Sequence, residues 1–75
     1  MPNQYFGMSL EALHYLLWHR RMSGDQVRIV QKTLAEELNV SRQRVTQVLG
    51  ELEEAGRLTR TAQKSVYLVA DPAAS

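Results

Sequence analysis

Residues 31–50 have the sequence QKTLAEELNVSRQRVTQVLG, and this stretch decides the fold. Its apolar residues recur at helical spacing both before and after Asn39-Val40-Ser41. Thr33-Leu34-Ala35-Glu36 has the form of a capping box that opens a helix ending at Leu38, and Ser41 is suited to cap a second helix. The stretch therefore predicts two helices that a turn of three or four residues forces to cross at a steep angle.

The residues around the turn meet the demands of such a crossing. Ala35 is small where the second helix must approach the first, and Asn39 tolerates the left-handed backbone conformation that a tight turn needs. The side chains expected to lock the inner faces together are all apolar: Leu34, Leu38, Val40, Val45 and Val48. The apolar spacing continues through Leu52 and Ala55 to Gly56, which predicts the end of the second helix.

The outward face of this second helix, at about residues 42–55, carries hydrogen-bonding side chains and no acid in its first two turns. Arg and Gln side chains can form paired hydrogen bonds with guanine and adenine in the major groove of DNA. Ser and Thr hydroxyls and helix N-termini suit phosphates. The residues predicted to read base edges are Arg42, Gln43, Arg44 and Gln47. Those predicted to contact the DNA backbone are Lys32, Thr33, Ser41, Thr46 and Arg57.

A further helix is expected before this pair, capped by Ser9 and running from Leu10 to about Met22, where Ser23-Gly24-Asp25 stops it. One apolar stripe of this helix, formed by its leucines, is expected to face the core. Tyr15, Trp18 and Met22 form a second stripe on nearly the opposite side. Either they too are core residues or they need another partner, and we predict a homodimer interface. Its residues are Tyr5, Phe6, Tyr15, Trp18 and Met22.

Three short strands complete the expected fold. Alternating and β-branched residues predict one strand at 26–30, and a polar turn joins two more at 57–61 and 65–69. The element order is α-β-α-α-β-β, and the fold class is α+β with a small three-stranded antiparallel sheet. The predicted core is Leu10, Leu13, Leu17, Val27, Ile29, Leu34, Leu38, Val45, Leu49, Leu52, Leu58, Val66 and Leu68. An N-terminal extension at 1–8 and a frayed tail at 71–75 flank the domain at 9–70.

Over this domain the chain resembles a winged helix-turn-helix DNA-binding domain. Residues 34–42, LAEELNVSR, have the common form of the motif. Residues 41–49, SRQRVTQVL, followed by LEEAGRL at 52–58, are similar to the DNA-binding domain of the catabolite-activator family. The C-terminal hairpin also resembles the wing of the multiple-antibiotic-resistance-regulator and GntR families. Asn39 stands where glycine is commoner in the turn.

The resemblance implies a prokaryotic transcription regulator whose recognition helix enters the major groove. It also implies a wing at 59–65 that reaches the flanking backbone or minor groove through Arg60, Gln63 and Lys64. Effector sensing defines several of these families through an attached ligand-binding domain. Because these 75 residues leave no room for one, no small-molecule effector is implied.

Composition limits the other possibilities. The absence of cysteine excludes disulfides, zinc ribbons and thiol catalysis, and it favours the cytoplasm. The apolar runs are too short for a membrane span, and no signal peptide is visible. No catalytic constellation, phosphate-binding loop or metal cluster is apparent, so we expect no enzyme, cofactor or metal. His14 and His19 are expected to be surface residues.

The net charge of +1 conceals an uneven distribution. Residues 41–50 and 57–65 together hold five basic residues and no acid, whereas the remainder holds four basic and eight acidic residues. Such polarity directs one face toward polyphosphate. Glu51, Glu53 and Glu54 are expected to form a solvated face away from DNA, and Gly50 to permit close approach of the first helix or of a partner.

We therefore predict a homodimer that binds specific double-stranded DNA sequences, is associated with the nucleoid, and represses transcription by occupying its site. One alternative is a replication, partition or nucleoid-organising protein, which binds arrays of sites or bends DNA. The other is a winged-helix module that binds proteins and not DNA.

Overall fold

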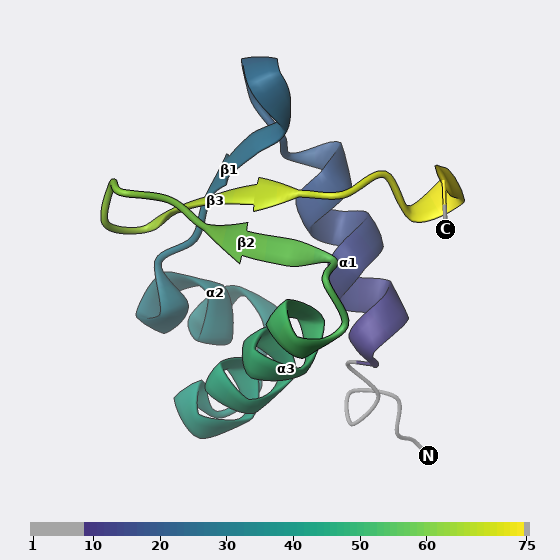
Figure 1. Cartoon of the computed structure of the whole chain (residues 1–75). Coiled ribbons are helices and arrows are strands. Elements are labelled where there is room, and N and C mark those ends of the chain that lie inside the picture. The colour runs from purple at the N-terminus through teal and green to yellow at the C-terminus, as the bar shows by residue number, and fades with distance from the viewer. Residues whose placement is uncertain (1–8, 75) are drawn as a thin grey trace.

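The computed structural model describes residues 9–74 of the chain, and the α+β fold predicted from the sequence is confirmed (Figure 1). The helices and strands follow the expected order α-β-α-α-β-β. They are α1 (Leu10–His19), β1 (Gln26–Arg28), α2 (Gln31–Leu38), α3 (Arg42–Glu54), β2 (Leu58–Arg60) and β3 (Val66–Val69), with 3-10 turns η1 (Ser23–Asp25) and η2 (Pro72–Ala74). The predicted segment 1–8, with Tyr5 and Phe6, lies outside the described residues.

The three strands form an antiparallel sheet in the order β1-β3-β2. Val27 lies opposite Tyr67 and Leu58 lies opposite Val69. Because opposed residues share a face of the sheet, these four side chains point to the same side, and α1 and α3 cover them (Figure 1). The sheet and the helices thus enclose one core.

The core prediction is wrong for Leu68. Leu68 lies opposite Gln26 and Thr59 on the outer face of the sheet and is 40% exposed, whereas its neighbours Tyr67 and Val69 are buried. Since successive strand residues alternate between faces, predicting Leu68 in the core assigned an outward-facing residue of β3 to the inside. The other predicted core residues are buried, apart from Leu10 and Leu38, which are half-buried.

Helix α1 begins as predicted and ends early. Its N-cap is Ser9, whose Oγ accepts a hydrogen bond from the Ala12 backbone N–H at 3.1 Å. The helix ends at His19, three residues before the predicted Met22. The Met22 N–H donates to the Gln26 carbonyl, so this part of the chain already belongs to the turn that leads into β1.

The capping box predicted at Thr33 is wrong. Helix α2 begins at Gln31, its N-cap Val30 makes no side-chain capping bond, and Thr33 is an exposed residue of the first turn. The Leu34 N–H donates to the Val30 carbonyl at 2.9 Å, which extends the helix back past the expected cap. A backbone hydrogen bond therefore replaces the side-chain bond that the sequence favours.

Two smaller differences concern the ends of elements. Each strand is one or two residues shorter than predicted. The segment expected to fray after residue 70 contains the turn η2, in which the Ala73 N–H donates to the Asp71 carboxylate at 2.9 Å and which packs against α1.

Candidate nucleic-acid interface

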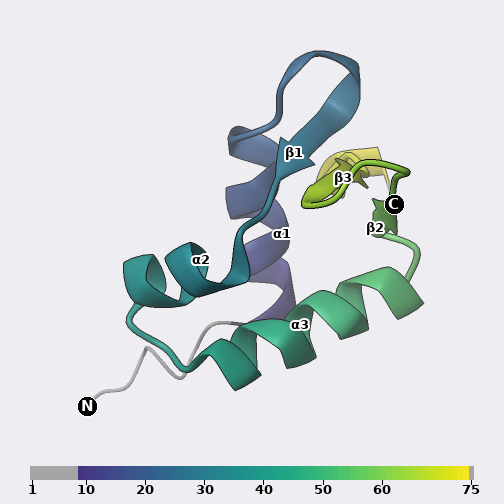
Figure 2. The same ribbon diagram turned by 90° about the vertical axis from the view of Figure 1, so that its left-hand side faces the viewer.

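The turn between α2 and α3 fixes the direction of α3 (Figure 2). Asn39 adopts the left-handed conformation, with φ 57°, as predicted. The Val40 N–H donates to the Ala35 carbonyl at 3.0 Å and closes the end of α2. The next residue is Ser41, whose Oγ accepts a hydrogen bond from the Arg44 N–H at 3.0 Å, which confirms Ser41 as the N-cap of α3. The start of α3 is therefore held by local hydrogen bonds.

Helix α3 buries one side and exposes the other. Val45, Val48 and Leu52 are at most 1% exposed and anchor it in the core. Most side chains predicted to contact DNA lie on its exposed side: Ser41, Arg42, Gln43, Thr46 and Gln47. Arg44 is half-buried, and its Nη1 donates to the Gln47 Oε1 at 3.3 Å. The structure thus places three of the four predicted base-reading residues on the exposed side of α3 and joins the fourth, Arg44, to Gln47.

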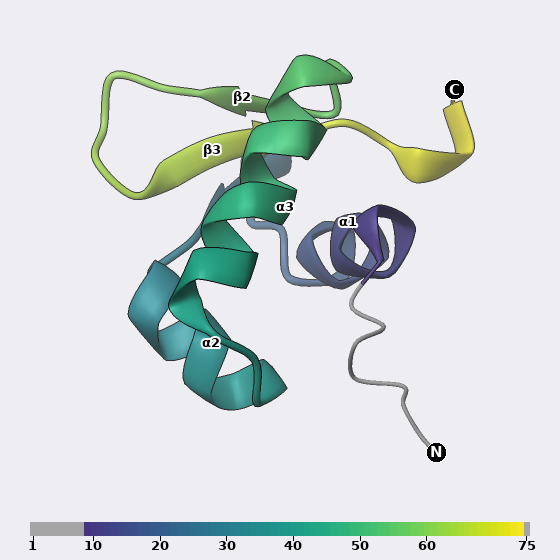
Figure 3. The same cartoon turned by 90° about the horizontal axis from the view of Figure 1, so that it is seen from below.

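A groove of about 400 Å³ lies between the β2–β3 hairpin and the N-terminal ends of α2 and α3. Figure 3 shows the hairpin projecting beside α3. Four basic residues line the groove, one or two from each element: Lys32, Arg42, Arg60 and Lys64. No acidic residue is among the described residues that line it, so the groove is strongly electropositive. Gln63, predicted in the wing, also lines it.

The structure adds Gln31, which sequence reasoning missed, to this surface. Gln31 also lines the groove, and its Oε1 accepts a hydrogen bond from the Thr46 Oγ1 at 2.6 Å. Thr46 was predicted to contact phosphate through that hydroxyl, which in the structure also lies 3.1 Å from the Arg42 carbonyl. Gln31 could not be found by periodicity because its position depends on a residue of the next helix.

Arg60 of the hairpin is held by an acid of α3. Its Nε donates to the Glu53 Oε1 at 3.0 Å, and its guanidinium carbon lies 5.9 Å from the centre of the Tyr67 ring. The hydrogen bond to Glu53 raises the pKa of Arg60 above its ordinary value, and the charge of Glu53 acts in the same direction. Glu53 was predicted on a solvated face, and in the structure it is half-buried.

Of the residues predicted to contact the DNA backbone, Lys32 lines the groove, Ser41 and Thr46 lie on the exposed side of α3, and two lie elsewhere. Arg57 precedes β2 and lines a separate hollow with Glu11, His14 and Tyr15. Thr33 lines a third hollow with residues of α1 and β1 and with Arg20, which follows α1. The predicted backbone set is therefore split, with Lys32 in the groove and Arg57 and Thr33 away from it.

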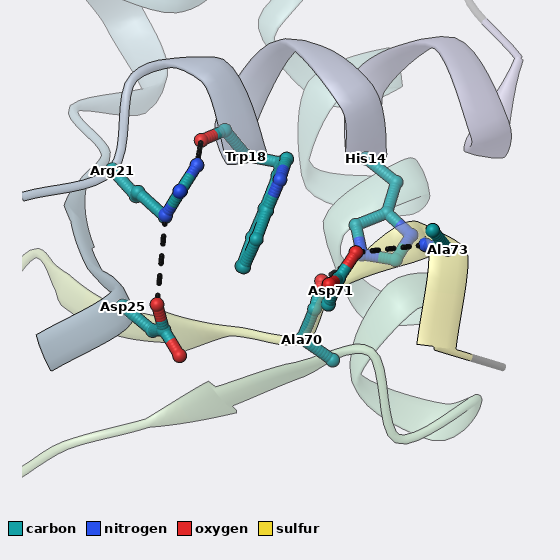
Figure 4. Close-up of polar contacts among 7 residues, drawn as sticks. All are labelled: His14, Trp18, Arg21, Asp25, Ala70, Asp71 and Ala73. Atoms are coloured by element: carbon teal, nitrogen blue, oxygen red, sulfur yellow. Dashed lines mark hydrogen bonds and ion pairs between the residues drawn. The ribbon is translucent and has the colours of Figure 1, made fainter.

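The second stripe of α1 is partly used inside the domain. Trp18 is half-buried and packs against the core, and the Arg21 guanidinium lies 3.8 Å from its ring centre (Figure 4). Arg21 also donates to the Trp18 carbonyl at 2.9 Å and pairs with Asp25 at 3.5 Å. Tyr15 and Met22 remain 52% and 45% exposed. Two residues of the predicted interface are thus accessible, and Trp18 belongs mainly to the fold.

His14 is a buried residue, so its prediction as a surface histidine is wrong. It is 3% exposed, and its Nε2 lies 2.7 Å from the Ala70 carbonyl, which follows β3 (Figure 4). A carbonyl oxygen only accepts, so Nε2 carries the proton. His19 is exposed as expected. Among residues 9–74, no group of three His, Cys, Asp or Glu side chains is placed to hold a metal ion.

The surroundings of Gly50 test one part of its prediction. An added Cβ at Gly50 meets no atom within 4 Å, so helix α1 does not approach it. Within the described part of the chain, no helix is long and apolar enough to cross a membrane.

Two crossed helices, a buried anchoring side on the second of them, and a β-hairpin beside it define a winged helix-turn-helix domain. The Crp-like helix-turn-helix domain family matches residues 12–74, and the chain belongs to this family of DNA-binding domains. None of the curated proteins compared with the chain matches it. The resemblance to the catabolite-activator family in the sequence is thereby confirmed.

Proposed function

We propose that this domain binds specific double-stranded DNA sequences as a homodimer and represses transcription by occupying its site. The observation that carries the proposal is the acid-free groove with four cations beside the exposed Arg and Gln side chains of α3. In this arrangement α3 enters the major groove, and the phosphates of the flanking strand enter the groove between α3 and the hairpin.

The residues of this surface take different roles in the proposal. Arg42, Gln43, Arg44 and Gln47 read base edges, because their side chains can form paired hydrogen bonds with guanine and adenine. Lys32 and Lys64 contact phosphate from opposite walls of the groove. Gln31, supported by Thr46, offers its amide nitrogen beside them. Ser41 positions α3 by capping its N-terminus. Arg57 and Thr33 act at most as peripheral contacts.

The experiment is a selection of bound duplexes from random DNA, run at two salt concentrations. We expect a conserved site whose two halves repeat at about 10 base pairs or a multiple of it, and an affinity that falls steeply with salt. Arg42→Ala should weaken binding to the selected site. Arg28→Ala is the matched control, because it removes the same charge from an exposed residue of β1 that does not line the groove. Equal losses for the two variants would contradict the proposed surface.

The homodimer is proposed from two large apolar side chains that stay exposed. They are Tyr15 of α1 and Met22 in the turn that leads into β1. Met22→Ser and Tyr15→Ser should shift sedimentation from dimer toward monomer while leaving the thermal midpoint of the monomer unchanged. Trp18→Ala is a poor test of association, since Trp18 also packs against the core.

A nucleoid-organising or partition role remains the second candidate, because it uses the same surface. A protected footprint much longer than two half-sites, or bending of the duplex, would favour it. The third candidate, a protein-interaction module, predicts no salt-dependent DNA affinity. The homodimeric repressor of the first proposal also associates with the nucleoid and acts without an effector. Fluorescence of the tagged protein over the nucleoid tests its nucleoid association.

A further inference from the structure

The ion pair between α3 and the hairpin is not used by the proposed function. Glu53 lies near the C-terminal end of α3, and Arg60 ends β2, so the pair joins the recognition helix to the wing. The Glu53 side chain is 26% exposed and that of Arg60 is 69% exposed. Glu53 is therefore the fixed partner, and Arg60 is the one that faces solvent.

The contact occupies only one edge of the guanidinium. Nε donates to Glu53 and the flat face lies near Tyr67. Within residues 9–74 the structure gives the two terminal nitrogens of Arg60 no hydrogen-bond partner, and Arg60 lines the groove. Those nitrogens form the planar fork that binds a phosphate through two parallel hydrogen bonds. Glu53 thus restrains Arg60 with the phosphate-binding edge left available.

We propose that Glu53 is a specificity-determining residue, which positions Arg60 for one phosphate of a seated duplex and repels DNA that is not seated. This inference rests on the proposed DNA binding. On the specific site, α3 lies in the major groove and brings a phosphate to the fork, which is already oriented and loses little rotamer freedom on binding. On other sequences the backbone takes no fixed position, and the Glu53 carboxylate only adds like-charge repulsion.

The two effects of Glu53 have opposite signs, which makes them measurable. Glu53→Gln should lower the affinity for the selected site about threefold and raise the affinity for a scrambled duplex about threefold, since exposed ion pairs are worth up to about this factor. The ratio of specific to non-specific affinity should therefore fall about tenfold. Glu53→Asp, which keeps the charge and shortens the reach, should lower specific affinity and leave non-specific affinity unchanged.

Glu54 is the matched control because it is an exposed acid next to Glu53 with no ion pair among the described residues. Glu54→Gln removes the same charge without releasing Arg60, so it should raise both affinities alike. In an Arg60→Gln background, Glu53→Gln should behave as Glu54→Gln does. The Arg60 Nε–H resonance should keep its position when the specific duplex is added to the wild-type protein.

The outcomes separate the inference from the proposed function. If the wild-type chain binds no DNA, the proposed function fails and the inference fails with it. If the wild-type chain binds specifically and Glu53→Gln changes both affinities in the same direction, or changes neither, Glu53 has no role in specificity. A shift of the Arg60 Nε–H resonance to that of Glu53→Gln on DNA binding would also overturn the inference, because the pair would then break in the complex.

Discussion

The groove side and the α1 side of this domain differ in what their side chains already contact. On the groove side, Arg42, Gln43 and Lys32 are exposed and polar. The helix α3, which carries the first two, is held by the Ser41 cap and buried valines, and α2, which carries Lys32, is held by buried Leu34 and Ala35. On the α1 side, Trp18 packs against the core. The Arg21 guanidinium lies over the Trp18 ring and donates a hydrogen bond to the Trp18 carbonyl.

The difference shows where function can be inferred from a pattern in the sequence. An exposed polar side chain on a rigid helix still needs a partner, so the groove side predicts a ligand. An apolar stripe on a helix of a small domain is readily absorbed by its own fold, because a chain of this length has few other side chains with which to build a core. Of the described residues in the predicted interface, Tyr15 and Met22 remain accessible to a second copy.

The largest effect is expected at Trp18, where the α1 side contributes to the fold. Trp18→Ala removes a half-buried ring and its contact with Arg21, and it should lower the free energy of unfolding by about 3 kcal/mol. Urea denaturation measures this. Tyr15 lies on the same side and is 52% exposed, so Tyr15→Ala should lower the free energy of unfolding far less. Equal losses would mean that the whole stripe is structural.

A smaller effect is expected at Arg44 on the groove side. Arg44→Ala should weaken binding to the selected site by about 1–3 kcal/mol and relax the preference at the bases it reads. The control is Lys64→Ala, which should weaken all sequences alike and reduce the salt slope by about one unit. Titration of both variants against the selected and scrambled duplexes gives the comparison. If Arg44→Ala costs the same on both duplexes, Arg44 does not read bases.

A substitution at Gly50 is expected to stabilise the fold slightly, whereas Trp18→Ala destabilises it. Gly50 lies inside α3 without a positive φ, and an added Cβ meets nothing within the described chain. Gly50→Ala should therefore raise the free energy of unfolding by about 0.5–1 kcal/mol by restricting the unfolded chain. Thermal and urea unfolding at two protein concentrations measure it. A loss of stability that grows with concentration would show that a second copy occupies this space.

Local chemistry allowed much of this fold to be predicted. Ser9, Asn39 and Ser41 take the conformations that their side chains favour, and each acts within four residues of itself. The prediction at Thr33 failed because a backbone hydrogen bond of Val30 competes with the local cap. In β3 the alternation of faces was predicted, but Leu68 was assigned to the core face in place of its neighbour Tyr67. Because Val66 and Tyr67 are both apolar, hydrophobicity alone does not show which face is buried.

The residues that sequence reasoning missed depend on distant partners. His14 is buried because it bonds to Ala70, 56 residues away. Gln31 joins the groove through Thr46 on the next helix, and Glu53 is half-buried because Arg60 reaches back to it from the hairpin. No periodicity within one element carries such information. The sequence therefore predicted basic residues of the candidate site on α2, α3 and the hairpin, and it missed the contacts of Gln31 and Glu53, which join two elements.

The smallest effect concerns an ion pair beside the α1 side. The Arg20 guanidinium donates to both Glu37 carboxylate oxygens, at 2.7 and 2.8 Å, and these hydrogen bonds hold the pKa of Glu37 below its ordinary value. A carboxylate whose pKa is lowered by folding stabilises the fold above its unfolded pKa, about 4.3. That stability is lost as the pH falls through the lower, folded pKa. Both side chains are nearly half exposed, so the contribution is small.

Glu37→Gln should therefore be slightly less stable than the wild-type chain near pH 7, and the difference should shrink in acid, as the pH falls through the lowered pKa of Glu37 and the carboxylate is protonated. Urea midpoints of the two proteins across this range measure the difference. Glu36→Gln is the control, because Glu36 is an exposed neighbour with no ion pair among residues 9–74. A difference for Glu37→Gln that persists unchanged at low pH would show that packing of the side chain, and not its charge, stabilises the contact between α1 and α2.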